Sequence, residues 1–179
     1  STPLAFLMHD ALNSNIWGEP GGGWMGTGWR AGRDLKRHDI GGKTGTTNSS
    51  KDAWFSGYGP DIVTSVWIGF DDHRRDLGRT TASGAIKDQI SGGEGGAKSA
   101  QPAWDDYMKA ALEGVPEQKM PPPPGILSVT IDKYTGKLSS GGAGSKSEYF
   151  IDGTQPTEYS VQEAGTTVTD SGGESHELF

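Results

Sequence analysis

The sequence predicts an α+β fold in which an antiparallel sheet is flanked by helices. Three segments typical of strands, residues 41–47, 53–58 and 62–70, follow one another with only short turns between them. Such a succession favours an antiparallel meander. Apolar residues recur at helical spacing in two segments outside this run, residues 2–14 and 101–113. We therefore expect these two helices to cover the sheet.

The first helix is expected to begin at Thr2 and to end near the run Asn13-Ser14-Asn15. Proline, which occupies position 3, is well tolerated in the first turn of a helix. A short second helix should then run to Leu35, with Thr27 accepting a hydrogen bond from an amide of its first turn.

The sheet and the last helix follow from composition. Residues 53–58 are rich in aromatic side chains and end at Gly59-Pro60-Asp61, a turn signal, and residues 62–70 are rich in β-branched side chains. Residues 71–96 are polar and glycine-rich, which predicts a surface loop. The helix over residues 101–113 should bury one face, formed by Trp104, Met108, Ala111 and Leu112.

Composition also predicts where this domain ends. Residues 1–113 contain all six tryptophans, with 12 basic and 14 acidic residues, whereas residues 114–179 have four basic and nine acidic residues and few large apolar ones. The first part can bury a core. For the second part we expect a proline-rich linker at residues 121–124, a hairpin that pairs residues 126–132 with 137–138, and a low-complexity acidic tail from residue 139. Within that tail, only Glu148-Tyr149-Phe150-Ile151 is expected to dock.

Charge and residue types exclude several functions. The net charge is −7 and no segment clusters Lys and Arg, which argues against nucleic-acid binding. The chain has no cysteine, which excludes disulfides and a cysteine nucleophile, and its four histidines lack metal-ligand spacing. We expect no metal and no cofactor. No apolar run approaches the roughly 18 residues of a membrane span, and because the chain begins at Ser1 without a signal peptide, it is expected to be a piece of a longer protein.

The run Ile40-Gly41-Gly42-Lys43-Thr44-Gly45-Thr46-Thr47-Asn48 carries the clearest chemistry. In an edge strand, Lys43 would offer a positive charge to a substrate carboxylate, and the hydroxyls of Thr44 and Thr46 would donate hydrogen bonds to the same carboxylate. Side chains alternate along a strand, and a twist or bulge at Gly45 could bring several of these groups around one pocket. The amide of Thr46 could form one arm of an oxyanion hole.

Two other interpretations of this run are weaker. Gly42-Lys43-Thr44 matches the end of the phosphate-binding loop pattern, but that pattern requires glycine at position 37, where the chain has Arg37. A hairpin without chemistry would be the better explanation of the tetrapeptide Lys43 to Thr46 if it stood alone. The flanking residues decide between these interpretations.

Three runs together, GGKTGTTN at residues 41–48, KDAWFSGY at 51–58 and VTSVWIGFD at 63–71, closely resemble the transpeptidase domain of class A penicillin-binding proteins, the bifunctional peptidoglycan synthases. The resemblance covers residues 1–113 and extends weakly to residues 149–154. It implies a serine β-lactamase/transpeptidase-like fold of which only the C-terminal part is present here. Residues 114–179 would form an extension.

The resemblance also implies a reaction. A serine attacks the D-Ala-D-Ala amide of a peptidoglycan stem peptide, releases D-Ala and passes the acyl group to an amine of a neighbouring strand, and β-lactams trap the same serine. The matching catalytic groups are Lys43 and the amide of Thr46. The implied binding residues for substrate and β-lactam are Lys43, Thr44, Gly45, Thr46 and Thr47.

One part of the family pattern is absent from the chain. No Lys has Ser three positions before it, and no Asn has Ser two positions before it, so neither Ser-x-x-Lys nor Ser-x-Asn occurs. We therefore expect the nucleophile upstream and this segment to stay bound to the N-terminal portion of the same protein. The family resemblance places such a protein at the periplasmic face of the bacterial inner membrane, attached through an upstream anchor and carrying a glycosyltransferase domain.

Two alternatives stay open. The same site could belong to a hydrolase, either a DD-carboxypeptidase or a β-lactamase, in which water rather than an amine resolves the acyl-enzyme. The segment could also be a non-catalytic module that binds peptidoglycan or a partner.

Overall fold

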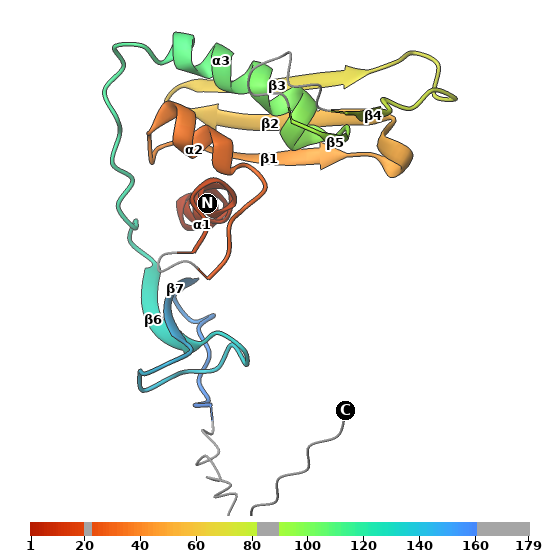
Figure 1. Cartoon of the computed structure of the whole chain (residues 1–179). Coiled ribbons are helices and arrows are strands. Elements are labelled where there is room, and N and C mark those ends of the chain that lie inside the picture. Colours follow the sequence, from red (N-terminus) through yellow and green to blue (C-terminus); the bar gives the residue numbers. More distant parts are fainter. Residues whose placement is uncertain (20–22, 82–89, 161–179) are drawn as a thin grey trace, which may run out of the picture. The chain divides into compact units, whose positions relative to one another are not determined.

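The computed structural model describes residues 1–19, 23–81 and 90–160, and it divides into two compact units after Pro124 (Figure 1). The first unit contains the elements α1 (Thr2–Trp17), α2 (Trp29–Leu35), β1 (Gly41–Thr46), η1 (Asn48–Ser50), β2 (Asp52–Gly59), β3 (Ile62–Gly69), β4 (Arg79–Thr80), β5 (Gly92–Gly93), the π-helical turn η2 (Gly96–Ala100) and α3 (Gln101–Ala111). The second unit contains β6 (Ile126–Asp132) and β7 (Ser145–Ile151). The α+β class predicted from sequence is confirmed.

The predicted meander is the sheet of the first unit. Its strand order is β1-β2-β3, both pairings are antiparallel, and β1 pairs with β2 from Gly41 opposite Tyr58 to Thr46 opposite Ala53. The β2–β3 turn needs a left-handed residue, and Asp61 takes that conformation with a φ of 58°. β1 is therefore an edge strand of this sheet.

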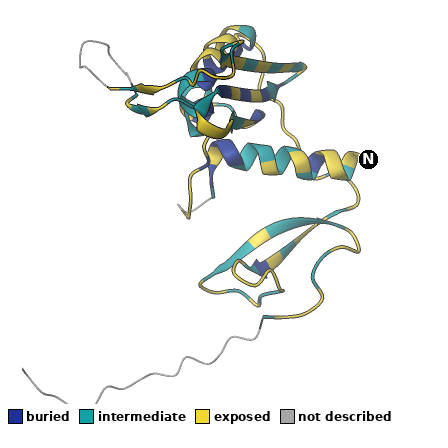
Figure 2. Cartoon of the chain, turned by 90° about the vertical axis from the view of Figure 1, so that its right-hand side faces the viewer, coloured by how far each residue is buried: buried dark blue, intermediate teal, exposed yellow. Residues whose placement is uncertain are grey.

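The helices do not all cover the sheet in the same way. In Figure 1, α2 and α3 lie over one face, whereas α1 lies along the β1 edge. The core forms under α3, where Trp104 and Met108 are fully buried and the Trp104 ring packs against Phe55 with a centroid separation of 4.8 Å. Gly57 is required beside them, because a Cβ atom there would lie 2.6 Å from the Trp104 ring. The predicted buried face of α3 is confirmed for Trp104, Met108 and Leu112, whereas Ala111 is only half-buried. Figure 2 shows buried residues concentrated in the sheet and at the C-terminal end of α1.

Two expectations at the first helices are wrong. α1 continues to Trp17 instead of ending within Asn13-Ser14-Asn15, because Asn13 and Asn15 direct their side-chain amides to backbone carbonyls outside the helix and do not compete with its own hydrogen bonds. Thr27 does not cap α2, whose N-cap residue is Gly28; the Thr27 hydroxyl is used elsewhere, as described below.

The second unit differs most from expectation. β6 pairs along its whole length with β7, and residue Leu138 of the predicted return strand makes only isolated bridges. The turn after β6 is closed by Asp132, whose carboxylate accepts from the amides of Tyr134 and Thr135. The expectation of a tail from residue 139 is therefore wrong for residues 145–151, which include the predicted docking piece 148–151. The acidic tail predicted beyond residue 160 lies outside the described residues.

The boundary between the units follows the proline-rich run at residues 121–124 and not residue 113. Residues 115–118 belong to the first unit, because they are hydrogen-bonded to the turn that precedes β1.

A buried carboxyl group in α3 makes the stability of the first unit depend on pH. Asp105 is 4% exposed, and burial together with the nearby charge of Asp34 raises its pKa to about 7. Because the folded state binds this proton more tightly than the unfolded state, its stability falls as the pH rises from about 4 through 7, by an amount on the order of 3 kcal/mol.

Asp105→Asn should therefore stabilise the intact protein at pH 8 and leave its stability nearly unchanged at pH 4. Chemical denaturation at both pH values checks this, with the exposed neighbour Asp106→Asn as the control. If the two variants change the pH dependence equally, the burial of Asp105 is not its cause.

Candidate active site

The candidate site is built on the outer edge of β1. The amide of Thr47 donates to the carbonyl of Asp52 across the β1–β2 turn at 3.0 Å. Because hydrogen-bonded positions alternate in an antiparallel pair, the backbone groups of Gly42, Thr44 and Thr46 point away from β2. The edge strand thus presents the amide of Thr46 outward, as an oxyanion-hole donor requires.

The outward carbonyls of this edge are capped one after another. Asn13 Nδ2 donates to the carbonyl of Ile40, and Asn15 Nδ2 donates to that of Gly42, both at 2.8 Å. Lys43 Nζ donates to the next outward carbonyl, that of Thr44, at 2.9 Å. α1 therefore fixes the position of the strand along its edge. The hydrogen bonds of the two asparagines to this edge could not be predicted, since nothing in the sequence of a helix reveals which strand edge lies beside it.

The structure brings Lys43 and the Thr44 hydroxyl together. Lys43 Nζ lies 3.2 Å from Thr44 Oγ1, because the long lysine side chain curls back past its own strand, and no bulge at Gly45 is needed. Thr44 Oγ1 is in turn 2.7 Å from Thr27 Oγ1, which donates to Asn15 Oδ1. The result is an exposed ammonium group beside a chain of hydroxyls, which suits a carboxylate ligand.

Thr46 and Thr47 are held differently. The hydroxyl of Thr46 accepts from the amide of Gly96 at 3.0 Å, so it is engaged with the start of η2. The hydroxyl of Thr47 accepts from the Asp52 amide at 2.8 Å and donates to the Asp52 carboxylate. Hydrogen bonds from Trp67 and Thr47 lower the pKa of Asp52. Thr47 therefore closes the β1–β2 turn, while Thr46 connects β1 to η2.

The C-terminal end of the loop predicted over residues 71–96 lies beside the site. Glu94 accepts from Thr80, Lys98 and Ser99, and the Lys98 ammonium lies 2.7 Å from its carboxylate. Burial alone would raise the pKa of Glu94, but these partners lower it to about 2. The ion pair anchors the Gly95-Gly96 turn against β1. The hydrogen bond from the Gly96 amide to Thr46 joins residues 50 positions apart, and no local pattern predicts it.

Other kinds of site are not seen in the described parts of the chain. Within residues 1–19, 23–81 and 90–160, no group of three or more His, Asp or Glu side chains could hold a metal ion. The helices described are all too short or too polar to cross a membrane.

Comparisons with known proteins identify the family. Residues 122–163 match the family model described as penicillin-binding protein 1A, C-terminal domain. The chain is 75% identical over its whole length to 21% of penicillin-binding protein 1A of Escherichia coli, and 51% identical over 98% of its length to 22% of that of Vibrio cholerae. The crystal structure of penicillin-binding protein 1A from Haemophilus influenzae superposes on 90% of the chain with a TM-score of 0.78 at 50% identity, and the match covers 22% of that protein.

These matches run through both units described above, and the chain spans about a fifth of the length of the relatives. The chain belongs to the penicillin-binding protein 1A family and carries the C-terminal region of its members.

Proposed function

We propose that this chain forms the substrate-binding wall of a peptidoglycan DD-transpeptidase. The observation that carries the proposal is the arrangement on the outer edge of β1, where Lys43 Nζ lies 3.2 Å from the Thr44 hydroxyl and the Thr46 amide points the same way from the strand. A cation and a hydroxyl suit the terminal carboxylate of D-Ala-D-Ala. An outward amide suits the oxygen of its scissile carbonyl.

The reaction then proceeds in two acyl transfers. A serine hydroxyl from outside these 179 residues attacks the penultimate D-Ala carbonyl, whose oxygen takes on negative charge that the Thr46 amide stabilises. The C–N bond breaks, and D-Ala leaves after its nitrogen receives a proton. An amine of a second stem peptide attacks the resulting ester, and the serine oxygen leaves and regains its proton. Lys43 supports the first step by holding the carboxylate of the departing D-Ala, and both steps by contributing positive charge to the proton network.

The remaining residues of the motif support the geometry. Gly45 has no side chain and lets the ligand approach the backbone closely. Thr47 fixes the end of the strand through Asp52. β-Lactams would occupy the same edge, with their carboxylate on Lys43 and Thr44 and their ring carbonyl at the Thr46 amide.

The family assignment supports the wider setting of the proposal. The chain would remain bound to the N-terminal portion of the same protein, which supplies the serine, a membrane anchor and a glycosyltransferase domain. The site would face the periplasm at the bacterial inner membrane and act in cell-wall synthesis on peptidoglycan stem peptides.

Product analysis of the intact protein tests this reaction. Incubation with pentapeptide-bearing glycan strands should release D-Ala and form cross-linked dimers in step, and penicillin should abolish both. Release of D-Ala with trimmed but uncrosslinked peptides would replace transfer by hydrolysis. No release at all would contradict the proposal.

A further inference from the structure

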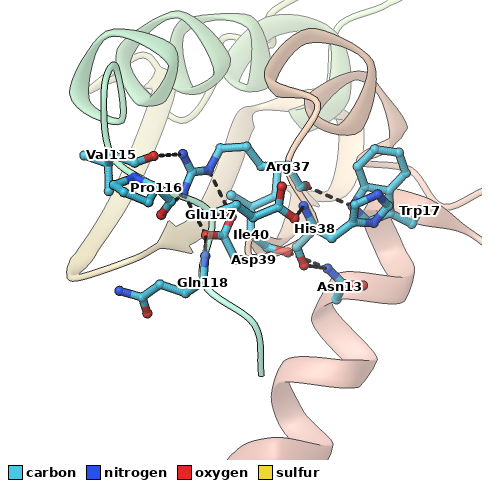
Figure 3. Close-up of polar contacts among 10 residues, drawn as sticks. All are labelled: Asn13, Trp17, Arg37, His38, Asp39, Ile40, Val115, Pro116, Glu117 and Gln118. Carbon is cyan, nitrogen blue, oxygen red and sulfur yellow. Dashed lines mark hydrogen bonds and ion pairs between the residues drawn. The ribbon is translucent and has the colours of Figure 1, made fainter. Parts of the chain in front are cut away.

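The turn that leads into β1, residues 37–40, is held from two sides. We call it the entry turn. On one side, Asn13 Nδ2 of α1 donates to the carbonyl of His38 at 2.8 Å, and Trp17 Nε1 donates to that of Arg37 at 3.2 Å. The rings of Trp17 and His38 also stack with a centroid separation of 4.1 Å. α1 thus fixes one side of the entry turn (Figure 3).

The other side of the entry turn is held by residues 115–118, which we call the exit segment because they carry the chain out of the first unit. Arg37 Nη1 donates to the carbonyl of Val115 at 2.6 Å, and its Nη2 donates to that of Pro116 at 3.2 Å. In the reverse direction, the amide of Gln118 donates to Asp39 Oδ2 at 2.8 Å. A fourth contact runs from the amide of His38 to Glu117 Oε1, also at 2.8 Å. Figure 3 shows the two segments facing each other across these contacts.

A buried ion pair lies between them. Arg37 and Asp39 form a bidentate pair, with Nε–Oδ1 and Nη2–Oδ2 distances of 2.9 Å and 2.7 Å. Their side chains are only 12% and 1% exposed. Burial alone would raise the pKa of Asp39, but the hydrogen bonds from Arg37 and Gln118 outweigh it, and its pKa lies below the usual range. The carboxylate therefore stays charged and keeps both segments in register.

We propose that the exit segment positions the active strand through Arg37 and Asp39. The inference rests on the proposed transpeptidase function. The entry turn ends at Ile40, three residues before Lys43, so a displacement of the turn moves the head of β1 with it. A misplacement of about 1 Å at a reacting group costs about 100-fold in rate. Arg37 and Asp39 act through the strand and do not contact the substrate, so they are positioning residues.

A positioning role makes a prediction that a merely stabilising contact does not. If the exit segment favours a strand geometry that the bound β-lactam also favours, the bound β-lactam and the exit segment stabilise each other, because coupling between binding at two sites is reciprocal. Hydrogen exchange at the Gln118 amide should therefore slow when the protein is acylated by a β-lactam.

Glu117 offers the sharpest test because it lies on the exit segment and its side chain accepts a hydrogen bond from the amide of His38 on the entry turn. In the intact protein, Glu117→Ala should reduce the second-order rate of acylation by a fluorescent penicillin about 3- to 10-fold, since the His38 amide loses its acceptor and the entry turn loses one of its contacts with the exit segment. Glu117→Gln keeps an acceptor oxygen and should restore the rate. Lys119→Ala, two residues along on the same exposed stretch, should leave it unchanged.

Arg37→Met tests the ion pair itself, with Arg74→Met as the matched control. Arg74 also makes a bidentate pair, with Asp72, but that pair is exposed on a surface loop. Arg37→Met should slow acylation by more than about tenfold and remove the acylation-dependent protection of Gln118, and Arg74→Met should do neither. If Arg37→Met does not fold, Glu117→Ala and Glu117→Gln decide the matter.

The outcomes separate this inference from the function on which it rests. An intact protein that no penicillin labels contradicts the transpeptidase proposal. A labelled protein whose acylation rate and Gln118 exchange are the same in wild type, Glu117→Ala and Arg37→Met contradicts the positioning role alone.

Discussion

Replacing Lys43 by alanine in the intact protein is expected to slow acylation by a fluorescent penicillin by about 100-fold or more. The variant removes the ammonium group that lies beside the Thr44 hydroxyl and with it the charge that holds the ligand carboxylate. Lys43 is exposed, so the fold should persist and the loss should fall on the reaction. Stopped-flow or quenched labelling gives the rate, and thermal unfolding shows whether the protein is intact.

The matched control is Lys109→Ala, which removes an exposed lysine from the surface of α3. It should leave the acylation rate unchanged. If Lys43→Ala acylates as fast as Lys109→Ala, the segment is a binding module without a part in catalysis, and the proposed role of β1 is wrong.

Gly96→Ala is expected to have the next largest effect. A Cβ atom at this position would lie 2.3 Å from the carbonyl oxygen of Trp54 and 2.6 Å from that of Gly45. Both neighbours are backbone atoms, so η2 has to move away from β1. The movement also breaks the hydrogen bond from the Gly96 amide to Thr46. We expect a destabilisation of about 3 kcal/mol and an acylation rate reduced about tenfold or more.

Gly93→Ala provides the control, since a Cβ atom at Gly93 would meet nothing within 4 Å. Chemical denaturation and the acylation rate of both variants check the prediction. Equal behaviour of Gly96→Ala and Gly93→Ala would show that the close approach of η2 to β1 does not matter for the site.

The sequence predicts those parts of the fold that depend on patterns of residues close together in the chain. The meander can be predicted because a segment rich in aromatic residues and a segment rich in β-branched residues are separated by a strong turn signal. The buried face of α3 can be predicted because Trp104, Met108 and Leu112 recur at helical spacing. β7 was missed because the glycine- and serine-rich residues before it resemble a tail, and its pairing with β6 depends on a partner more than ten residues away.

The candidate site was predicted in part for the same reason. Lys43, Thr44 and Thr46 could be identified because they lie in one short run whose residue types indicate the chemistry. The residues that hold this strand in place were not predicted, because Asn15, Arg37 and Gly96 act through contacts with distant segments. Asn15, in the predicted helix stop, and Gly96, in the predicted surface loop, support the strand.

The most direct measurement is to locate the covalent adduct that penicillin forms with the intact protein. We expect proteolysis and mass spectrometry to find the penicilloyl group on a serine outside these 179 residues, and the isolated segment to remain unlabelled. A penicilloyl serine within residues 1–179 would contradict the claim that this chain supplies the binding wall and not the nucleophile.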